Sequence, residues 1–176
     1  MNNELAQYVD INHFHDNRGY FCETLNLSKP PFNQLKYIQS NMSVNNNGAL
    51  RGMHYQHKYP QGKFCYVASG AAFDFAIDLR KSSPNFMKCH TFYLEPKGPA
   101  VWIPPGYAHG FFSCINNTVF CYHVFGNVWN KDDEHSINPM TVPDIKHMIE
   151  VKLDVIVSPK DIAGYEYTAS NYPIYE

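Results

Sequence analysis

The segment Ala71-Ala72-Phe73-Asp74-Phe75-Ala76-Ile77-Asp78-Leu79-Arg80 alternates apolar residues with small or acidic ones. Successive side chains of a β-strand point to opposite faces of its sheet. One face of this strand would carry Asp74, Ala76 and Asp78, and the other Phe73, Phe75, Ile77 and Leu79. The segment therefore predicts a strand with one apolar face. Its acidic face would either line a polar cavity or lie half-exposed at the surface.

Short runs rich in strand-forming residues recur on both sides of this segment, at 19–24, 35–41, 63–69, 90–94, 100–103, 110–115 and 118–125. Turn-forming residues separate them, as in Asn45-Asn46-Asn47-Gly48 and Pro104-Pro105-Gly106. Many short strands with closely spaced turns indicate an all-β sandwich or barrel. Only the end of the chain predicts helices, one over 143–150 and one that begins at Ser158 with Pro159 in its first turn. The length of 176 residues indicates one domain over residues 1–176.

The charge balance excludes two classes of partner. The chain has 14 basic and 16 acidic residues, whereas nucleic-acid and membrane-surface binding normally require a basic excess. Residues 1–10 do not resemble a signal peptide, and no apolar stretch reaches the roughly 18 residues of a membrane span. The five cysteines form no C-x-x-C pair, so we expect unbridged, mostly buried thiols in a reducing compartment, the cytoplasm.

A first polar cluster groups Arg51, His54, Gln56 and Lys63 within 13 positions. Clustered cations suggest a bound anion. The alternative is that His54 is a structural histidine. Regular strand alternation would put Arg51 on one face, and His54 and Gln56 on the other.

Metal binding by this cluster is not expected. His54 and His57 are three positions apart, so on a strand they would point to opposite faces and would not converge on one ion.

Two further residues are candidates for chemistry. His109 follows the Pro104-Pro105-Gly106 turn at the start of a strand, where it either takes part in catalysis or pairs in the core with a carboxylate such as Asp74. Tyr122 lies in the strand run 118–125 and is able to donate a proton if it points inward, although most buried tyrosines only pack and form one hydrogen bond.

Together these clusters resemble the dTDP-4-dehydrorhamnose 3,5-epimerase family. The motifs that carry the resemblance follow one another over residues 10 to 165: Asp16-Asn17-Arg18-Gly19-Tyr20-Phe21-Cys22-Glu23, Gln39-Ser40-Asn41-Met42-Ser43, Leu50-Arg51-Gly52-Met53-His54, Gly62-Lys63, residues 73–86, residues 102–111, Tyr122, and Ser158-Pro159-Lys160-Asp161. The resemblance implies an all-β, cupin-type jelly-roll β-barrel with short C-terminal helices. It also implies a dimer that needs no metal and no dissociable cofactor.

The resemblance further implies a role for each matching residue. His54 would be the catalytic base, Asp161 its partner, Tyr122 the acid on the opposite face of the sugar, and Lys63 the group near the 4-keto oxygen. His109 and Asp74 would form a supporting pair. The residues that would contact the nucleotide sugar, some of them across the dimer interface, are Arg18, Phe21, Glu23, Gln39, Asn41, Arg51, Gln56 and His109.

The chain departs from the family pattern after Tyr122, where Trp129 stands near the place of a second tyrosine. The expected activity is therefore inversion of C3, C5 or both in a nucleotide-linked 4-keto-6-deoxy sugar. One alternative is a single-centre epimerase acting on a GDP- or CDP-linked sugar. The others are a non-catalytic sugar-binding cupin and a sugar 3,4-ketoisomerase.

Overall fold

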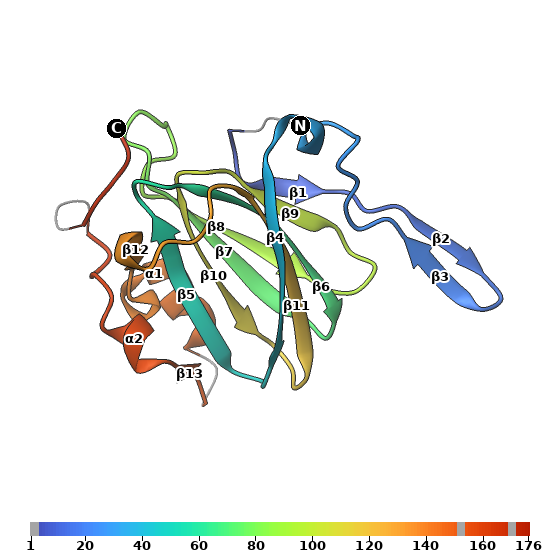
Figure 1. Cartoon of the computed structure of the whole chain (residues 1–176). Coiled ribbons are helices and arrows are strands. Elements are labelled where there is room, and N and C mark those ends of the chain that lie inside the picture. Colours follow the sequence, from blue (N-terminus) through green and yellow to red (C-terminus); the bar gives the residue numbers. More distant parts are fainter. Residues whose placement is uncertain (1–3, 151–153, 169–171) are drawn as a thin grey trace.

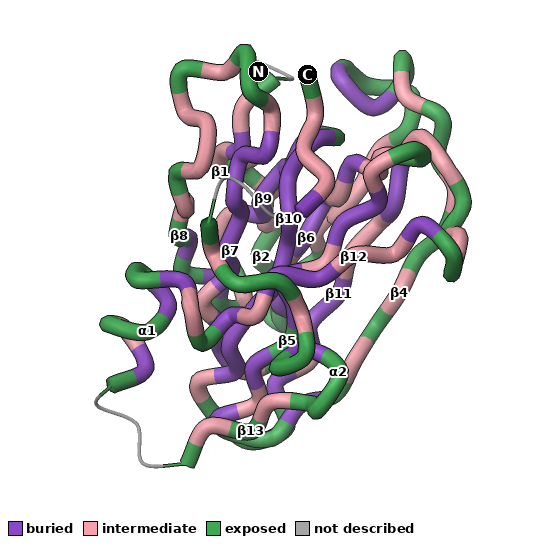
Figure 2. The backbone as a smooth tube through the Cα atoms, turned by 90° about the vertical axis from the view of Figure 1, so that its left-hand side faces the viewer, coloured by how far each residue is buried: buried purple, intermediate pink, exposed green. Residues whose placement is uncertain are grey.

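Two antiparallel sheets face each other in the computed structural model, which describes residues 4–150, 154–168 and 172–176 (Figure 1). The first sheet has the order β1-β9-β6-β11-β4. Its strands are β1 (Gln7–Val9), β9 (Ala100–Ile103), β6 (Gln61–Ser69), β11 (Thr118–Gly126) and β4 (Tyr37–Asn45). β4 lies at the edge of this sheet, and exposed residues recur along it (Figure 2).

The second sheet has the order β12-β5-β10-β7-β8, and β13 pairs with β5. Its strands are β12 (Glu134–Ser136), β5 (Ala49–Gln56), β10 (Tyr107–Ser113), β7 (Ala72–Asp78), β8 (Cys89–Leu94) and β13 (Ile156–Val157). Across the interior, the rings of Phe111 on β10 and Phe120 on β11 stack with their centroids 3.9 Å apart. The arrangement confirms the predicted all-β jelly-roll barrel.

β7 is buried on both faces, although apolar residues alternate with small or acidic ones in its sequence. Ala72 and Ala76 point into the core between the sheets, whereas Phe75, Ile77 and Leu79 belong to a second core on the outer side. That outer face is covered by the segment from Ile137 to Ile149 and by the last residues of the chain. The strand is therefore neither half-exposed nor the wall of an open cavity, because both of its faces are packed.

β5 does not follow the regular alternation expected from its sequence. A bulge interrupts its pairing with β10 between His109 and Phe111, and Gly52 adopts a φ of +118°. Leu50, Met53 and Tyr55 pack into the outer core. Arg51 and His54 consequently line the same cavity, so the expectation that they lie on opposite faces is wrong. An extra residue in a strand shifts the phase of every side chain beyond it.

The C-terminal part of the chain contains the two expected helices, α1 (Pro143–Ile149) and α2 (Pro159–Ile162). Ser158 caps α2, because its side chain accepts a hydrogen bond from the Asp161 N–H. The short 3₁₀ turns are η1 (Phe32–Gln34), η2 (Lys131–Asp133) and η3 (Pro139–Thr141). In the described ranges, no helix is long and apolar enough to cross a membrane.

A hairpin of β2 (His13–Asp16) and β3 (Gly19–Cys22) projects away from the barrel (Figure 1). Phe14 and Phe21 at its surface are 61% and 68% exposed. At the edge of the first sheet opposite β1, Met42 and Val44 of β4 are 68% and 58% exposed. An isolated hairpin with exposed aromatic side chains gains little stability in water.

Candidate active site

A cavity of about 740 Å³ opens between the two sheets and is closed on one side by residues 156–161. Side chains from β4, β5, β6, β10, β11 and α2 meet there. Its polar and titratable lining includes Asn41, Arg51, His54, Lys63, His109, Tyr122 and Asp161. The structure brings these residues into one cavity, although they come from six different elements.

His54 and Asp161 form a short side-chain contact in the cavity. His54 Nε2 lies 2.7 Å from Asp161 Oδ1, and the Gly52 N–H donates to Asp161 Oδ2 over 3.4 Å. Asp161 is buried, which opposes ionisation, but its hydrogen bonds with His54 and the Gly52 N–H outweigh this effect and hold its pKa below the usual range. A charged Asp161 keeps the proton on Nε2, so Nδ1 of His54 is the nitrogen with a free lone pair.

Lys63 and Tyr122 line the same cavity from neighbouring strands of the first sheet. Tyr122 on β11 lies opposite Cys65 of β6 on one side and opposite Asn41 of β4 on the other. Burial raises the pKa of Tyr122, so its phenol is protonated at neutral pH. Burial lowers the pKa of Lys63, and the carboxylates of Asp74 and Glu134 oppose that shift. A neutral acid and an amino group thus lie beside the His54 imidazole.

The side chain of Arg51 is held by Asn45, the last residue of β4. Its Nε donates to Asn45 Oδ1 over 2.8 Å, and Asn45 in turn donates to the Thr118 carbonyl. Gln39 donates to Asn41 Oδ1 over 3.0 Å, which fixes the amide that neighbours Tyr122. The guanidinium of Arg51 lines the cavity and is exposed to an incoming anion.

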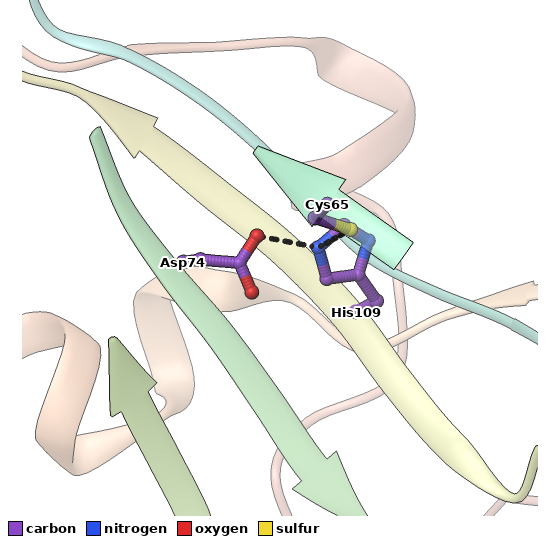
Figure 3. Close-up of side chains that lie close together, drawn as sticks. All are labelled: Cys65, Asp74 and His109. Atoms are coloured by element: carbon purple, nitrogen blue, oxygen red, sulfur yellow. Dashed lines mark hydrogen bonds and ion pairs between the residues drawn. The ribbon is translucent and has the colours of Figure 1, made fainter. Parts of the chain in front are cut away.

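His109 both pairs with Asp74 in the core and lines the cavity. It is 6% exposed and contacts Asp74 Oδ2 through Nε2 at 2.8 Å, as a core histidine would (Figure 3). It also lines the cavity. Burial lowers the pKa of His109, and Asp74 only partly opposes this effect. Cys65 Sγ lies 3.8 Å from the same Nε2, a neighbour that the sequence did not indicate.

A second cavity of about 210 Å³ shares His54, Lys63, Asn41 and Tyr122 with the first. Gln56 lines it, but the Gln56 amide donates to the carbonyls of Tyr59 and Val128 and accepts from the Asn130 N–H. Gln56 therefore holds the 127–130 loop in place, and its amide is not available for the substrate contact expected from the sequence.

Trp129 and Glu134 complete the second cavity. Trp129 is 53% exposed and hydrogen-bonds to Glu134. Lys160, the neighbour of Asp161, also donates to Glu134. Glu134 was missed from the sequence because it ends the charged run Lys131-Asp132-Asp133-Glu134, which looks like an ordinary solvent-exposed turn.

Three expected substrate contacts lie away from the cavity. Arg18 pairs with Asp16 at the tip of the hairpin, and Glu23 pairs with Lys29. Phe21 faces Phe14 across the hairpin, with ring centroids 6.3 Å apart. None of them lines the two cavities described above.

His57 diverges from His54, as the spacing predicted. Its Nε2 contacts the Ile174 carbonyl at 3.0 Å, on the side of the C-terminal segment. Within the residues that the structure describes, a different trio, Cys65, Asp74 and His109, places ligand atoms within 4.8 Å of one another.

A jelly-roll barrel with a carboxylate-paired histidine, a partly buried lysine and a neutral tyrosine in one cavity has the groups of a proton-transfer isomerase. The model of the dTDP-4-dehydrorhamnose 3,5-epimerase family matches residues 4–168. The chain belongs to this family, and its barrel is of the cupin type.

Named relatives agree with this assignment. The dTDP-4-dehydrorhamnose 3,5-epimerase of Shigella flexneri is 34% identical over 165 residues, which cover 90% of this chain and 89% of the relative. A structure of the 3,5-epimerase of Legionella pneumophila, solved with dTDP-4-keto-L-rhamnose, superposes with a TM-score of 0.82 at 26% identity and covers 98% of this chain and 100% of that one. The structure of the 3'-monoepimerase ChmJ of Streptomyces bikiniensis, solved with dTDP-quinovose, superposes with a TM-score of 0.82 at 25% identity. The match covers 92% of this chain and 83% of that one.

Proposed function

We propose that this protein inverts C3 and C5 of a dTDP-linked 4-keto-6-deoxy sugar by removing and returning a proton at each carbon. The observation that carries the proposal is the His54–Asp161 pair, 2.7 Å apart, in a cavity that also holds Lys63 and Tyr122. The activity for which the relatives are named and the dTDP sugar bound to the Legionella enzyme support the choice of substrate.

The first step uses the acidity of hydrogens next to a ketone. The Nδ1 lone pair of His54 takes the proton from C3 or C5, and the electrons of the broken C–H bond move into an enolate with its charge on the 4-oxygen. Asp161 stabilises the imidazolium that forms, because a charged carboxylate 2.7 Å away favours the protonated ring. Lys63 is the group that stabilises the enolate oxygen.

Inversion requires a proton from the opposite face of the sugar. Tyr122 is the acid in this step: its O–H proton passes to the carbon, and the enolate electrons form the new C–H bond. The phenolate then regains a proton from solvent, and the His54 imidazolium gives its proton up to solvent. Burial keeps the Tyr122 phenol protonated until it is needed. A positioned acid or base of this kind contributes roughly 10²–10⁴-fold to the rate.

The remaining polar residues would bind the substrate. Arg51 supplies a fixed positive charge for the diphosphate, and Gln39, Asn41 and His109 offer hydrogen bonds around the sugar and nucleotide. The mechanism needs neither a metal ion nor a dissociable cofactor, because the 4-ketone itself acidifies the reacting hydrogens.

A single-centre reaction is the second candidate. It is favoured by the similarity to the 3'-monoepimerase of Streptomyces bikiniensis and by Trp129, which lines the second cavity together with His54 and Tyr122. Deuterium incorporation at only one of the two carbons would distinguish it from the double inversion.

We further propose that two copies assemble into a homodimer in which the β2–β3 hairpin reaches the partner's cavity. Phe14, Phe21, Met42 and Val44 are all more than half exposed, an arrangement typical of an uncovered interface. Arg18 and Glu23 lie too far along the hairpin to line the cavity of their own chain, and a partner's cavity is where their charges would be used.

Residues 1–176 would act as one epimerase domain in the cytoplasm. The family match over residues 4–168 supports a single unit, and the unbridged state of Cys22, Cys65, Cys89 and Cys121 supports a reducing compartment.

The proposal is tested by incubating the purified protein with dTDP-4-keto-6-deoxyglucose in D₂O and following C3 and C5 by NMR. Matched samples with GDP- and CDP-linked 4-keto sugars test the nucleotide. We expect deuterium and inverted configuration at both carbons with the dTDP sugar. An absence of exchange with every sugar in the panel would argue for a binding protein.

A further inference from the structure

Three side chains that the proposed reaction does not use as acid or base lie close together, and one of them, His109, also lines the cavity (Figure 3). Cys65 comes from β6 in the first sheet, whereas Asp74 and His109 come from the paired strands β7 and β10 in the second. Their relative exposures are 0%, 0% and 6%. The group therefore bridges the two sheets inside the barrel.

The ligand atoms already lie near the spacing of a metal site. His109 Nε2 is 2.8 Å from Asp74 Oδ2 and 3.8 Å from Cys65 Sγ, and all three atoms lie within 4.8 Å of one another. Bonds of about 2.0–2.3 Å to a tetrahedral zinc ion put such atoms roughly 3.4–3.6 Å apart. The two distances from His109 Nε2 differ from this spacing by about 0.2–0.6 Å, and the upper limit of 4.8 Å leaves at most about 1.2 Å to close between the remaining pair of atoms.

A second observation points to a missing partner. Asp74 Oδ1 is buried and has no hydrogen-bond partner among the described residues. Buried carboxylate oxygens without partners are rare in native proteins, since each one loses its hydration. A cation between Asp74, His109 and Cys65 would compensate that loss.

We propose that Cys65, Asp74 and His109 bind one thiophilic divalent cation, for which Zn²⁺ is the representative. The thiolate and the carboxylate would neutralise its two positive charges, and the neutral imidazole would add the third ligand. The Cys65 thiol proton would leave to solvent as the metal binds, and the His109 proton would move from Nε2 to Nδ1, so that the imidazole stays neutral.

The cation would enter from the cavity. His109 lines the cavity, and no fourth Cys, His, Asp or Glu joins the trio in the part of the chain that the structure describes. Water from the cavity would supply the fourth ligand. This is the arrangement of an open metal site rather than of a closed structural one.

The consequence for activity rests on the proposed function. Lys63 lies two positions before Cys65, and a dication at the trio would add positive charge beside the group that stabilises the enolate. The metal would also fix His109 and remove its contact to Asp74. We therefore expect the bound cation to inhibit epimerisation, whereas the metal-free protein is fully active.

Binding is tested without reference to activity by titrating chelator-treated protein with Co²⁺ and with Zn²⁺. We expect a thiolate-to-cobalt charge-transfer band that saturates at one ion per chain, and its loss when Zn²⁺ displaces Co²⁺. Cys65→Val, which keeps an apolar side chain at a buried position, should abolish the band. Cys121→Ala removes a buried thiol outside the trio and should retain the band.

Cys65→Ser provides a nearly isosteric variant should valine disturb the fold. We expect it to weaken Zn²⁺ binding by roughly 10²-fold or more, since even the loss of an outer contact to a metal ligand costs 10–100-fold. No band in the wild type, or a band of equal size in folded Cys65→Val, overturns the site. Epimerisation measured in the same samples tests the proposed function independently of metal binding. Inhibition by Zn²⁺ should disappear in Cys65→Val.

Discussion

Asp161 lies 2.7 Å from His54 although the two residues are 107 positions apart in the sequence. Three local features produce this contact. Ser158 caps α2 and so orients Asp161, β13 runs parallel to β5, and the Gly52 N–H bonds to the second carboxylate oxygen. The pair therefore depends on the C-terminal segment being folded against the barrel.

Replacement of Asp161 by Asn tests this relationship. The amide is isosteric but uncharged, so it stabilises neither the imidazolium nor the Nε2–H tautomer. We expect proton exchange at C3 and C5 to fall by roughly 10²-fold or more. Asp144→Asn, at an exposed position of α1, is the matched control and should keep its rate. Equal exchange rates for the two variants would show that Asp161 has only a structural role.

Tyr122→Phe should separate two events that normally occur together. His54 would still remove a proton and return a solvent deuteron to the same face, which gives exchange without inversion. The yield of inverted sugar should fall by roughly 10²-fold or more, the effect of losing one general acid.

Deuterium content and configuration are measured in the same sample of the Tyr122→Phe variant. Inversion at the wild-type rate would assign the acid to another residue, and Trp129 and His123 are the next to be tested. His123 is the less suitable of the two, because its ring packs against Phe64 and Tyr66.

The proposed exchange of hairpins predicts complementation between two inactive variants. If Arg18 acts in the partner's cavity, a mixed dimer of Arg18→Ala and His54→Ala contains one intact site and one doubly altered site. Coexpression should restore about a quarter of the sites, since half of the dimers are mixed. Activity no higher than in either variant alone would place Arg18 within its own chain or outside the reaction.

Asp78 predicts a pH dependence of stability. It is buried, which opposes its ionisation, but hydrogen bonds from Arg80 and Ser83 at 2.6–2.8 Å hold its pKa below the usual value. A carboxyl group with a lowered pKa in the folded state contributes stability above its unfolded pKa of about 3.9. That contribution is lost as the pH falls through the lower, folded-state pKa.

Urea unfolding of Asp78→Asn measures this contribution. We expect a loss of roughly 1.5–3 kcal/mol at pH 7, the range for hydrogen bonds to charged groups, and a smaller further loss between pH 5 and pH 2 than in the wild type. Parallel pH profiles for the two proteins would contradict the assignment. Asp144→Asn serves again as the exposed control.

Much of the site could be predicted from the sequence because its residues occupy short motifs. The strand runs and turns indicated a barrel, and His54, Lys63, Tyr122 and Asp161 do line one cavity. Both C-terminal helices were likewise predicted, the second from Ser158 and Pro159 at its start.

What escaped prediction depends on contacts between distant segments or on irregular backbone. The bulge at Gly52–Met53 of β5 brings Arg51 to the same cavity as His54, and the sequence alone did not predict this irregularity. Glu134 is linked to the site by its hydrogen bonds with Trp129 and Lys160, which come from separate segments of the chain. Cys65 joins His109 only because the two sheets close on each other.

The central claim is that His54 removes the substrate proton, and deuterium exchange measures that step most directly. Wild-type protein and His54→Ala are incubated with dTDP-4-keto-6-deoxyglucose in D₂O, and circular dichroism and dTDP affinity show that both are folded and bind. We predict deuterium at C3 and C5 with the wild type and none at either carbon with His54→Ala. Substantial exchange in the folded, dTDP-binding variant would contradict the assignment of His54 as the base.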